Sequence, residues 1–375
     1  MIIMALDYVR EFVHSGALRF SAEDLAQTTV AIFFTRWITH ICAPVFMFTA
    51  GVGAFLRLQQ GRTKGELARF LSSRGAWLLL LEITVVRFAM TFNLDYSFVI
   101  LEVIWALGCC MILFAASIYL PVRVFAFLSI AMIALHNLTD GVNAAESGRF
   151  GRMWTALHQV VIFHVGSHSV LVSYPLVPWV AVMCLGFCFG RVLLLNPLLR
   201  RKWMIWLGAG LSLAFIMIRA VNLYGDPVRW TRQATPLFTV LSFLKATKYP
   251  PSLDFLLMTL GPALLLLAWF DRRQVARSNP LLVFGRVPLF FFVVHLFAIH
   301  GATALMNFLR YGNAPFLFAT LPSMGGPRAL FPPDFGYPLW AVYLVWVGVV
   351  VALYPICGWF ADVKARRDDW WLSYL

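Results

Sequence analysis

The feature that most constrains this chain is the recurrence of long apolar runs along its whole length. A helix of about 20 apolar residues covers the ~30 Å hydrocarbon core of a bilayer, so each run of that length is a candidate span. Nine such runs are present: 36–56, 75–92, 98–119, 121–137, 175–195, 203–222, 252–270, 281–300 and 338–360. A tenth, Met1–Val13, is too short to span alone and has the character of a truncated first helix. We therefore predict an all-α, polytopic membrane bundle of about ten transmembrane helices, forming a single domain over residues 1–375.

Composition supports a membrane protein and excludes other classes. Hydrophobic residues make up 61% of the chain and charged residues only 13%, which is unlike a soluble domain. The net charge of +13 does not indicate nucleic-acid binding, because basic residues gather in short links between apolar runs. More than half of the 30 Lys and Arg residues lie in the links 57–74, 120–123, 191–202 and 271–286 and after Phe360. The positive-inside rule then predicts that these links and the C-terminus are cytoplasmic, in a multi-pass protein of the cell inner membrane.

Cysteine and histidine spacing gives no metal site. All six cysteines lie in apolar runs and are interpreted as small packing residues. The sequence "HVGSH" (His164, His168) has Gly166 and Ser167 between its histidines, which disfavours the helix that a zinc site there would need. No metal is expected.

Ionisable groups inside apolar runs are costly, and they usually face a bundle interior, a partner or a water-filled cavity. Asp7, Arg10 and His14 follow a spacing that places them on one helical face, and Arg36 and His40 lie one turn apart on another. Local ion pairing is the alternative for the first group. Snorkelling to the interface is the alternative for arginines near outer helix ends, which are Arg36, Arg87 and Arg219.

Histidines are confined to one predicted side of the membrane. All eight map to the outer half of the spans or to the outer loops, near 138–174, 223–251 and 301–337: His14, His40, His136, His158, His164, His168, His295 and His300. Any single one is more often structural than catalytic. Together they indicate proton chemistry or an acceptor site at the outer face.

Several stretches resemble one family of membrane proteins: "MALDYVREFVH", "FFTRWITHICAPVFMFTAGVGAFL", "YPLVPWVAVMCLGF", "ATKYPPSLDFLLMTLGP", "FGRVPLFFFVVHLFAIH" and "DWWLSYL". They are similar to bacterial members of the heparan-alpha-glucosaminide N-acetyltransferase catalytic-domain family. The resemblance implies a multi-helix acyltransferase that takes acetyl groups from cytosolic acetyl-CoA. It also implies delivery to an amine or hydroxyl of a glycan or amino sugar at the far side. In the family a histidine in the first non-cytosolic loop is held to be catalytic. Here His14 opens that loop and His40 lies just inside the next helix.

Acyl transfer needs a base or a nucleophile, and donors for the tetrahedral oxyanion. A neutral imidazole suits the first task and a guanidinium the second. We therefore predict His40 as general base or transient acetyl carrier and Arg36 as the group that orients the acceptor or stabilises the oxyanion. Asp7 would fix the imidazole tautomer. His295, His14 and His136 are further candidates.

The phosphates of acetyl-CoA require a basic site, for which Arg200, Arg201, Arg272 and Arg273 have suitable charge, although the positive-inside rule alone also explains them. The outer cations Arg229, Arg232, Lys245 and Lys248 would suit an anionic glycan or a lipid head group, with a solvated loop as the alternative. Expected partners are thus acetyl-CoA, a glycan or amino-sugar acceptor and the lipid bilayer, with a homo-oligomer as an open alternative.

Two other functions compete with acyl transfer. In a proton-coupled secondary transporter Glu82, Glu102 and His295 would form a relay, although no convincing inverted repeat is found. A non-catalytic membrane partner is the third, suggested by the short first helix.

Overall fold

The computed structural model describes residues 1–142, 148–273, 275, 279–322, 327–367 and 369–374. Within that part the chain is mostly helical, and six helical segments are long and apolar enough to cross a membrane. They are Val30–Gln59, Val122–Thr139, Pro197–Val221, Leu253–Asp271, Pro288–Tyr311 and Leu339–Arg366. These six correspond to six of the ten predicted segments. The number ten is not confirmed, and the cytoplasmic C-terminus stays a prediction.

The remaining predicted segments form shorter or interrupted helices. Apolar helices of 15 residues cover Val103–Ser117 and Trp179–Leu193, and α1 has 12 residues. The run 75–92 ends a longer helix that passes through one π-helical turn, Glu82–Val86. Their apolar character was predictable, whereas their length depends on caps and breaks that hydropathy does not register.

The described chain divides into two compact units, and each is made from segments that are far apart in the sequence. The first unit contains Met1–Cys42, Thr84–Asp95 and Val275–Leu375. Its helices are α1 (Ile2–Val13), α2 (Val30–Trp37), the 3-10 turn η1 (Ile38–Ile41), α5 (Arg87–Thr91), α13 (Pro280–Arg286), α14 (Pro288–Tyr311), α15 (Pro315–Ala319) and α16 (Leu339–Arg366), with 3-10 turns at Arg328–Leu330 and Trp370–Tyr374. The expectation of one domain over 1–375 stays a prediction.

The second unit contains Ala43–Ile83 and Tyr96–Gln274. Its elements are α3 (Cys42–Gln59), α4 (Lys64–Leu81), β1 (Phe98–Leu101), α6 (Val103–Ser117), α7 (Val122–Leu135), η3 (His136–Thr139), α8 (Gly148–His158), β2 (Val161–Val165), β3 (His168–Val172), α9 (Trp179–Leu193), α10 (Pro197–Val221), α11 (Pro236–Leu244) and α12 (Leu253–Asp271).

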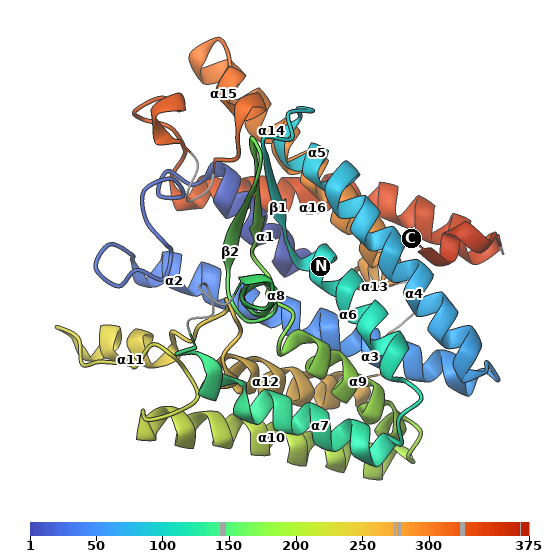
Figure 1. The fold of residues 1–375 in the computed structure, drawn as a ribbon. Helices are drawn as coiled ribbons and strands as arrows, with labels where there is room; N and C mark the ends of the chain where they lie inside the picture. Colours follow the sequence, from blue (N-terminus) through green and yellow to red (C-terminus); the bar gives the residue numbers. More distant parts are fainter. Residues whose placement is uncertain (143–147, 274, 276–278, 323–326, 368, 375) are drawn as a thin grey trace. The chain divides into compact units, whose positions relative to one another are not determined.

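Close helix contacts in this unit rely on glycine. Helices α10 and α12 lie side by side (Figure 1). A Cβ on Gly208 would come within 2.9 Å of the carbonyl oxygen of Gly261, so the two backbones meet where neither residue has a side chain. Small residues at helix crossings are a common way for membrane helices to gain packing contacts.

A small sheet corrects the all-α expectation. Three strands pair in the order β1-β3-β2, with β1 parallel and β2 antiparallel to β3. The predicted span 98–119 therefore begins with a strand, and only its part from Val103 onward is helical. Two residues, Gly166 and Ser167, join β2 to β3, and Gly166 adopts φ +62°, a conformation that glycine tolerates. Hydropathy missed the strands because Val, Ile and Phe are equally apolar in either conformation.

Proline and glycine shift the limits of the predicted span 281–300. Proline at position 288 begins α14, and Val287 before it leaves helical geometry with φ −130° and ψ 53°. Helix α14 then continues to Tyr311 and ends at Gly312, which has φ +76°. The outer loop predicted from residue 301 thus begins later. Part of the predicted link 271–286, including Arg277, lies outside the described residues.

Candidate active site

Helix α1 carries a polar cluster on an otherwise buried helix. Arg10 Nη2 lies 3.2 Å from Asp7 Oδ1 and 3.2 Å from Glu11 Oε1. The exposed fractions of the Arg10 and Asp7 side chains are 8% and 15%. The predicted common face for Asp7 and Arg10 is therefore present, and it is occupied by local ion pairs, the alternative raised from the sequence.

The first unit also joins this cluster to α2. Arg36 Nη1 donates to Asp7 Oδ2, and the exposed fraction of the Arg36 side chain is 10%. Asp7 is thus shared by the two guanidinium groups of Arg10 and Arg36. Ion pairing in a partly buried place, and not snorkelling, explains why Arg36 is tolerated here.

His40 lies in the 3-10 turn η1, between α2 and α3. The cause is local. Pro44 has no N–H, so the carbonyl of His40 lacks the i+4 donor that would continue an α-helix. Cys42 N instead donates to Thr39 O, which is a 3-10 bond. Such turns inside long helices often mark functional hinges. The His40 side chain is 1% exposed.

A carboxylate that the sequence did not single out lies beside this imidazole. Glu23 Oε1 is 3.2 Å from His40 Nε2, and its side chain is 19% exposed. The contact becomes a full ion pair when the imidazole is protonated. The sequence offered Asp7 as the orienting carboxylate, but Asp7 contacts Arg36 and Arg10. The available signal for Glu23 was its position as an acidic residue in the segment leading into α2.

Internal hydrogen bonds order the loop that carries Glu23. Ser21 Oγ accepts from Glu23 N at 3.3 Å, and Thr28 Oγ1 donates to Ala22 O at 2.7 Å. Asp24 accepts from Ala26 N and from the Gln27 amide. Short side-chain to backbone bonds of this kind fix a turn without regular structure, so the position of the Glu23 carboxylate is constrained.

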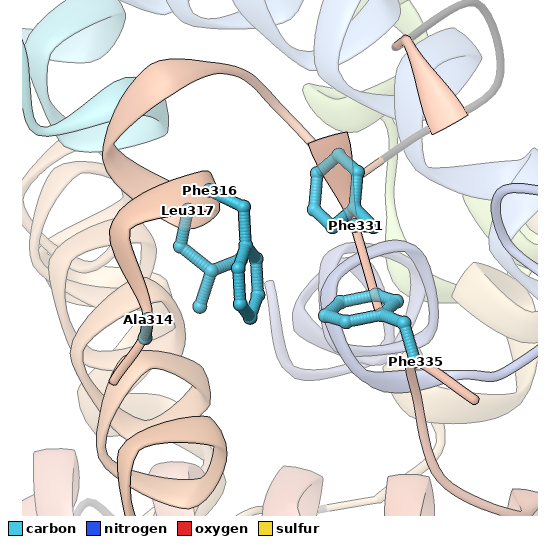
Figure 2. Packing of buried hydrophobic residues seen from close by; sticks show 5 residues of the cluster. All are labelled: Ala314, Phe316, Leu317, Phe331 and Phe335. Atoms are coloured by element: carbon cyan, nitrogen blue, oxygen red, sulfur yellow. The ribbon is translucent and has the colours of Figure 1, made fainter. Parts of the chain in front are cut away.

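An aromatic cluster supports the same loop from the C-terminal part of the unit. Figure 2 shows Phe316 and Leu317 of α15 next to Phe331 and Phe335 of the segment that precedes α16. The ring centroids of Phe331 and Phe335 are 4.9 Å apart, and Leu18 packs against the cluster. Arg19 donates to the carbonyl of Pro333 at 3.2 Å.

Gly336 lies directly against the backbone of Ser15. It has φ +91°, and a Cβ there would lie 2.5 Å from the Cα of Ser15. Next to it, Ser15 N donates to Tyr337 O at 3.0 Å and Tyr337 N donates to Val13 O at 2.8 Å. The backbone around His14 is therefore held against a glycine whose conformation and lack of a side chain are both required.

Replacing Gly336 by alanine is expected to destabilise the protein by about 1–3 kcal/mol, because it adds left-handed strain and a backbone clash. The measurement is the thermal unfolding midpoint of the purified protein in detergent. Gly348→Ala in α16 is the control, because a Cβ at Gly348 meets nothing within 4 Å. Equal midpoints for the Gly336 and Gly348 variants would contradict the prediction.

His14 ends α1 and has a structural partner. Its Nδ1 accepts from Gly16 N at 3.1 Å, and the residue is 6% exposed. Burial, and secondly the charge of Arg10, lower the pKa of His14 below its ordinary value of 6.5. Both effects favour the neutral imidazole, which is the form that can accept at Nδ1. Its catalytic role, predicted from the sequence, stays a prediction.

This lowered pKa has a consequence for stability as pH falls. Below about pH 6.5 the unfolded chain protonates His14 while the folded chain does not, so folding stability decreases. His14→Asn retains a side-chain acceptor but does not titrate. We expect the unfolding midpoint of the wild type to fall more between pH 7.5 and pH 5.5 than that of His14→Asn. Parallel decreases would show that His14 contributes nothing to the pH dependence.

The other predicted histidines lie in aromatic or backbone contacts. His295 in α14 is 0% exposed, its Nδ1 is 3.1 Å from Phe291 O, and its ring is 5.3 Å from that of Tyr8. Its Nε2 has no hydrogen-bond partner among the described residues. His136 contacts the carbonyls of Ile133 and Pro251, each at 2.9 Å. His295 thus keeps one ring nitrogen available, and His136 does not.

The four arginines predicted to bind acetyl-CoA lie at or near one end of the α10–α12 pair. Arg200 and Arg201 contact the carboxylate of Asp271 at 2.7 and 3.0 Å, which joins the start of α10 to the end of α12. Arg273 lies over the Trp269 ring, 5.0 Å from its centroid. Two guanidinium groups share the Asp271 carboxylate and Arg272 and Arg273 follow it in the sequence, so this end has an excess of positive charge, which fits a phosphate-bearing ligand.

Among the residues that the structure describes, no group of three His, Cys, Asp or Glu side chains is arranged to hold a metal ion. In the hairpin, His164 Nδ1 is 3.0 Å from Ser169 Oγ and His168 Nδ1 is 2.9 Å from Tyr96 O.

Helices of membrane-spanning length define a polytopic membrane protein, and its first unit holds a buried histidine beside a carboxylate. The chain belongs to the heparan-alpha-glucosaminide N-acetyltransferase catalytic family, whose model matches residues 18–224. The matched region includes Glu23, Arg36 and His40, as well as Arg200 and Arg201. No protein of curated function matches the chain.

Proposed function

We propose that this protein is a membrane acetyltransferase that moves an acetyl group from acetyl-CoA to an amine or hydroxyl of a glycan or amino sugar. Family membership supports acetyl transfer. The observation that carries the site assignment is the buried imidazole of His40 with Nε2 3.2 Å from the Glu23 carboxylate. An imidazole oriented by a carboxylate is the usual arrangement for a general base in acyl transfer.

In the proposed step, His40 donates Nε2–H toward Glu23 and takes the acceptor's proton at Nδ1. The acceptor nitrogen or oxygen forms a bond to the acetyl carbonyl carbon, and the C–S bond of the thioester breaks. The departing CoA thiolate receives the proton from the imidazolium. Glu23 stabilises the charge that appears on the ring, which is the role of the carboxylate in hydrolytic triads.

Arg36 has a supporting role in this proposal. Its guanidinium is held by Asp7, and Arg10 holds the same carboxylate from the other side. A guanidinium positioned in this way would orient an acceptor or stabilise the oxyanion, because it is a fixed positive charge with N–H donors in one plane. Asp7 would then position Arg36 and not His40.

His295 is the alternative base, because its Nε2 lacks a hydrogen-bond partner among the described residues. Its full enclosure by aromatic rings makes access for a polar acceptor less favourable than at His40, where Glu23 is partly exposed. The transporter hypothesis has weaker support. Glu82 accepts from the backbone N–H of Glu102 at 2.6 Å. This local hydrogen bond gives one oxygen of the buried carboxylate a structural partner without a proton relay.

The test of the function uses the purified wild-type protein in liposomes with acetyl-labelled acetyl-CoA and glucosamine-type acceptors. We expect loss of thioester and appearance of labelled acceptor. A transporter would move solute without consuming acetyl-CoA, and a non-catalytic partner would do neither. Sided addition of acetyl-CoA to oriented vesicles also tests the predicted cytosolic donor side.

Binding of acetyl-CoA is expected to weaken when the basic end of α10 and α12 loses charge. Arg272→Gln with Arg273→Gln should raise the KM for acetyl-CoA about 10-fold or more, because each lost charge-assisted hydrogen bond is worth ~1.5–3 kcal/mol. The matched control is Arg69→Gln with Arg123→Gln, which removes the same charge from exposed positions of the predicted cytoplasmic links 57–74 and 120–123. An equal rise in KM in both double variants would contradict a specific acetyl-CoA site at this end, because the loss of any two positive charges would then have the same effect.

A further inference from the structure

A lysine in the loop between α11 and α12 lies beside two aromatic rings. Lys248 is 8% exposed, and its Nζ lies 5.0 Å from the Tyr249 ring centroid and 6.0 Å from that of Tyr174. In the described part of the chain, no carboxylate forms an ion pair with it. A lysine side chain held in a largely buried place without a counter-charge is unfavourable, so this arrangement needs an explanation.

The surrounding loop is ordered by the one acidic residue between positions 222 and 252. Asp226 accepts from Thr247 N at 2.7 Å and from Ser252 Oγ at 2.6 Å. Ser252 N also donates to Thr247 O at 2.9 Å, which closes the segment Lys248–Pro251 into a short loop. Asp226 therefore positions both ends of the lysine segment while its own oxygens are engaged.

The aromatic neighbours of Lys248 contact one another. The hydroxyl groups of Tyr249 and Tyr174 are 3.3 Å apart, and their rings meet edge to face. Trp179, which is fully buried at the start of α9, lies 5.9 Å from the Tyr174 ring. A cation over aromatic faces is stabilised by about 0.5–2 kcal/mol. Leaving a buried charge without its counter-ion costs more than that, so the aromatic rings alone do not compensate the charge of Lys248.

We propose that Lys248, placed by Tyr174 and Tyr249, binds the phosphate group of a ligand at this loop. Four basic residues and one acidic residue lie between Asn222 and Ser252, so the loop has an excess of positive charge before any ligand binds. Tyr174 and Tyr249 lie in the loops that lead into α9 and α12, and tyrosine is typical of the membrane interface, the level at which phosphate groups are abundant. The phosphate is supplied by a lipid head group or by a soluble phosphate ester. This inference does not depend on acetyl transfer, because its readout is binding.

The test has one arm for each source of phosphate. Purified full-length protein in detergent is titrated with glucosamine 6-phosphate and followed by phosphorus NMR, and with phosphatidic acid followed by native mass spectrometry. Saturable binding of either probe is expected, and the probe that binds identifies the source. Lys248→Gln should weaken that binding about 10-fold or more, as expected for a charge-assisted hydrogen bond, and Lys248→Arg should retain most of it.

Arg229→Gln is the matched control, since it removes the same charge from an exposed residue of the preceding loop, between α10 and α11. Equal loss in the Lys248 and Arg229 variants, or no saturable binding of either probe, overturns the proposal. Labelling of lysines in the wild type with an amine-reactive acetylating reagent provides a test that needs no variant. The bound probe should slow labelling of Lys248 and leave Lys245 unchanged, and equal labelling with and without the probe would also refute the site.

Discussion

His40→Ala is expected to lower acetyl transfer by about 100-fold to 10,000-fold, the range that a positioned general base contributes. The expected loss is in kcat, because the imidazole acts on the reacting proton and not on the binding of acetyl-CoA. Glu23→Gln should cause a smaller loss. It retains a side chain of the same shape but cannot stabilise the imidazolium, so the pH at which the rate is half-maximal should also shift. Turnover of acetyl-labelled acetyl-CoA in liposomes, measured as a function of pH, separates these outcomes.

Two further variants give this prediction its controls. His158→Gln changes a histidine that stacks on Trp154 and has no role in the proposed chemistry, so its turnover should match the wild type. His295→Ala tests the alternative base. Normal turnover in His40→Ala together with loss in His295→Ala would move the chemistry to α14. A loss in His40→Ala with protein that no longer elutes as a single species would indicate a folding defect, and Glu23→Gln would then decide the assignment.

Arg219→Leu is expected to cause the largest loss of stability, about 3–5 kcal/mol, which is the cost of leaving buried charge partners uncompensated. The Arg219 side chain is 2% exposed, and its guanidinium donates to the carbonyls of Phe243, Val228, Ser242 and Lys245. It also lies 3.5 Å from Asp254 Oδ2. The leucine variant would leave these carbonyl groups and a buried carboxylate without their donor. The expected readout is a lower thermal midpoint in detergent.

Arg232→Leu is the comparison for this variant, because Arg232 is an exposed cation of the loop between α10 and α11. It should leave the midpoint nearly unchanged, and Arg219→Lys should fall between the two, since one ammonium group cannot reach as many carbonyl groups. A midpoint for Arg219→Leu equal to that of Arg232→Leu would show that the loop is held by other contacts.

The sequence predicted the parts of this protein that follow from hydropathy. Six of its apolar runs are helices of spanning length, and the shared face of Asp7 and Arg10 was read correctly from helical spacing. The strand Phe98–Leu101 was missed because its apolar residues continue directly into α6. For Arg219 the sequence offered snorkelling, whereas the guanidinium donates to carbonyls at the end of α11 and in the loops beside it, whose positions depend on tertiary structure.

The candidate site was predictable only in part, because some of its contacts depend on tertiary structure. His40 and Arg36 were accessible because they are polar residues in an apolar run. Glu23 was not, since a carboxylate in a polar loop is ordinary, and its proximity to His40 depends on turn bonds and on packing of the loop that carries it. The roles of His40, Arg36, Asp7, His295 and His14, and of the four arginines, stay predictions.

The division of the chain into interleaved units has a consequence for biosynthesis. The unit that contains Glu23 and His40 also includes Val275–Leu375, which is synthesised after the whole of the second unit. The aromatic cluster of Phe316, Phe331 and Phe335 that supports the loop at Leu18, and Tyr337 beside Ser15, are among these late residues. The environment of His40 therefore cannot be complete during insertion of the first helices. A nascent chain halted before α14 would contain Glu23 and His40 but not the later residues that pack against the loop carrying Glu23.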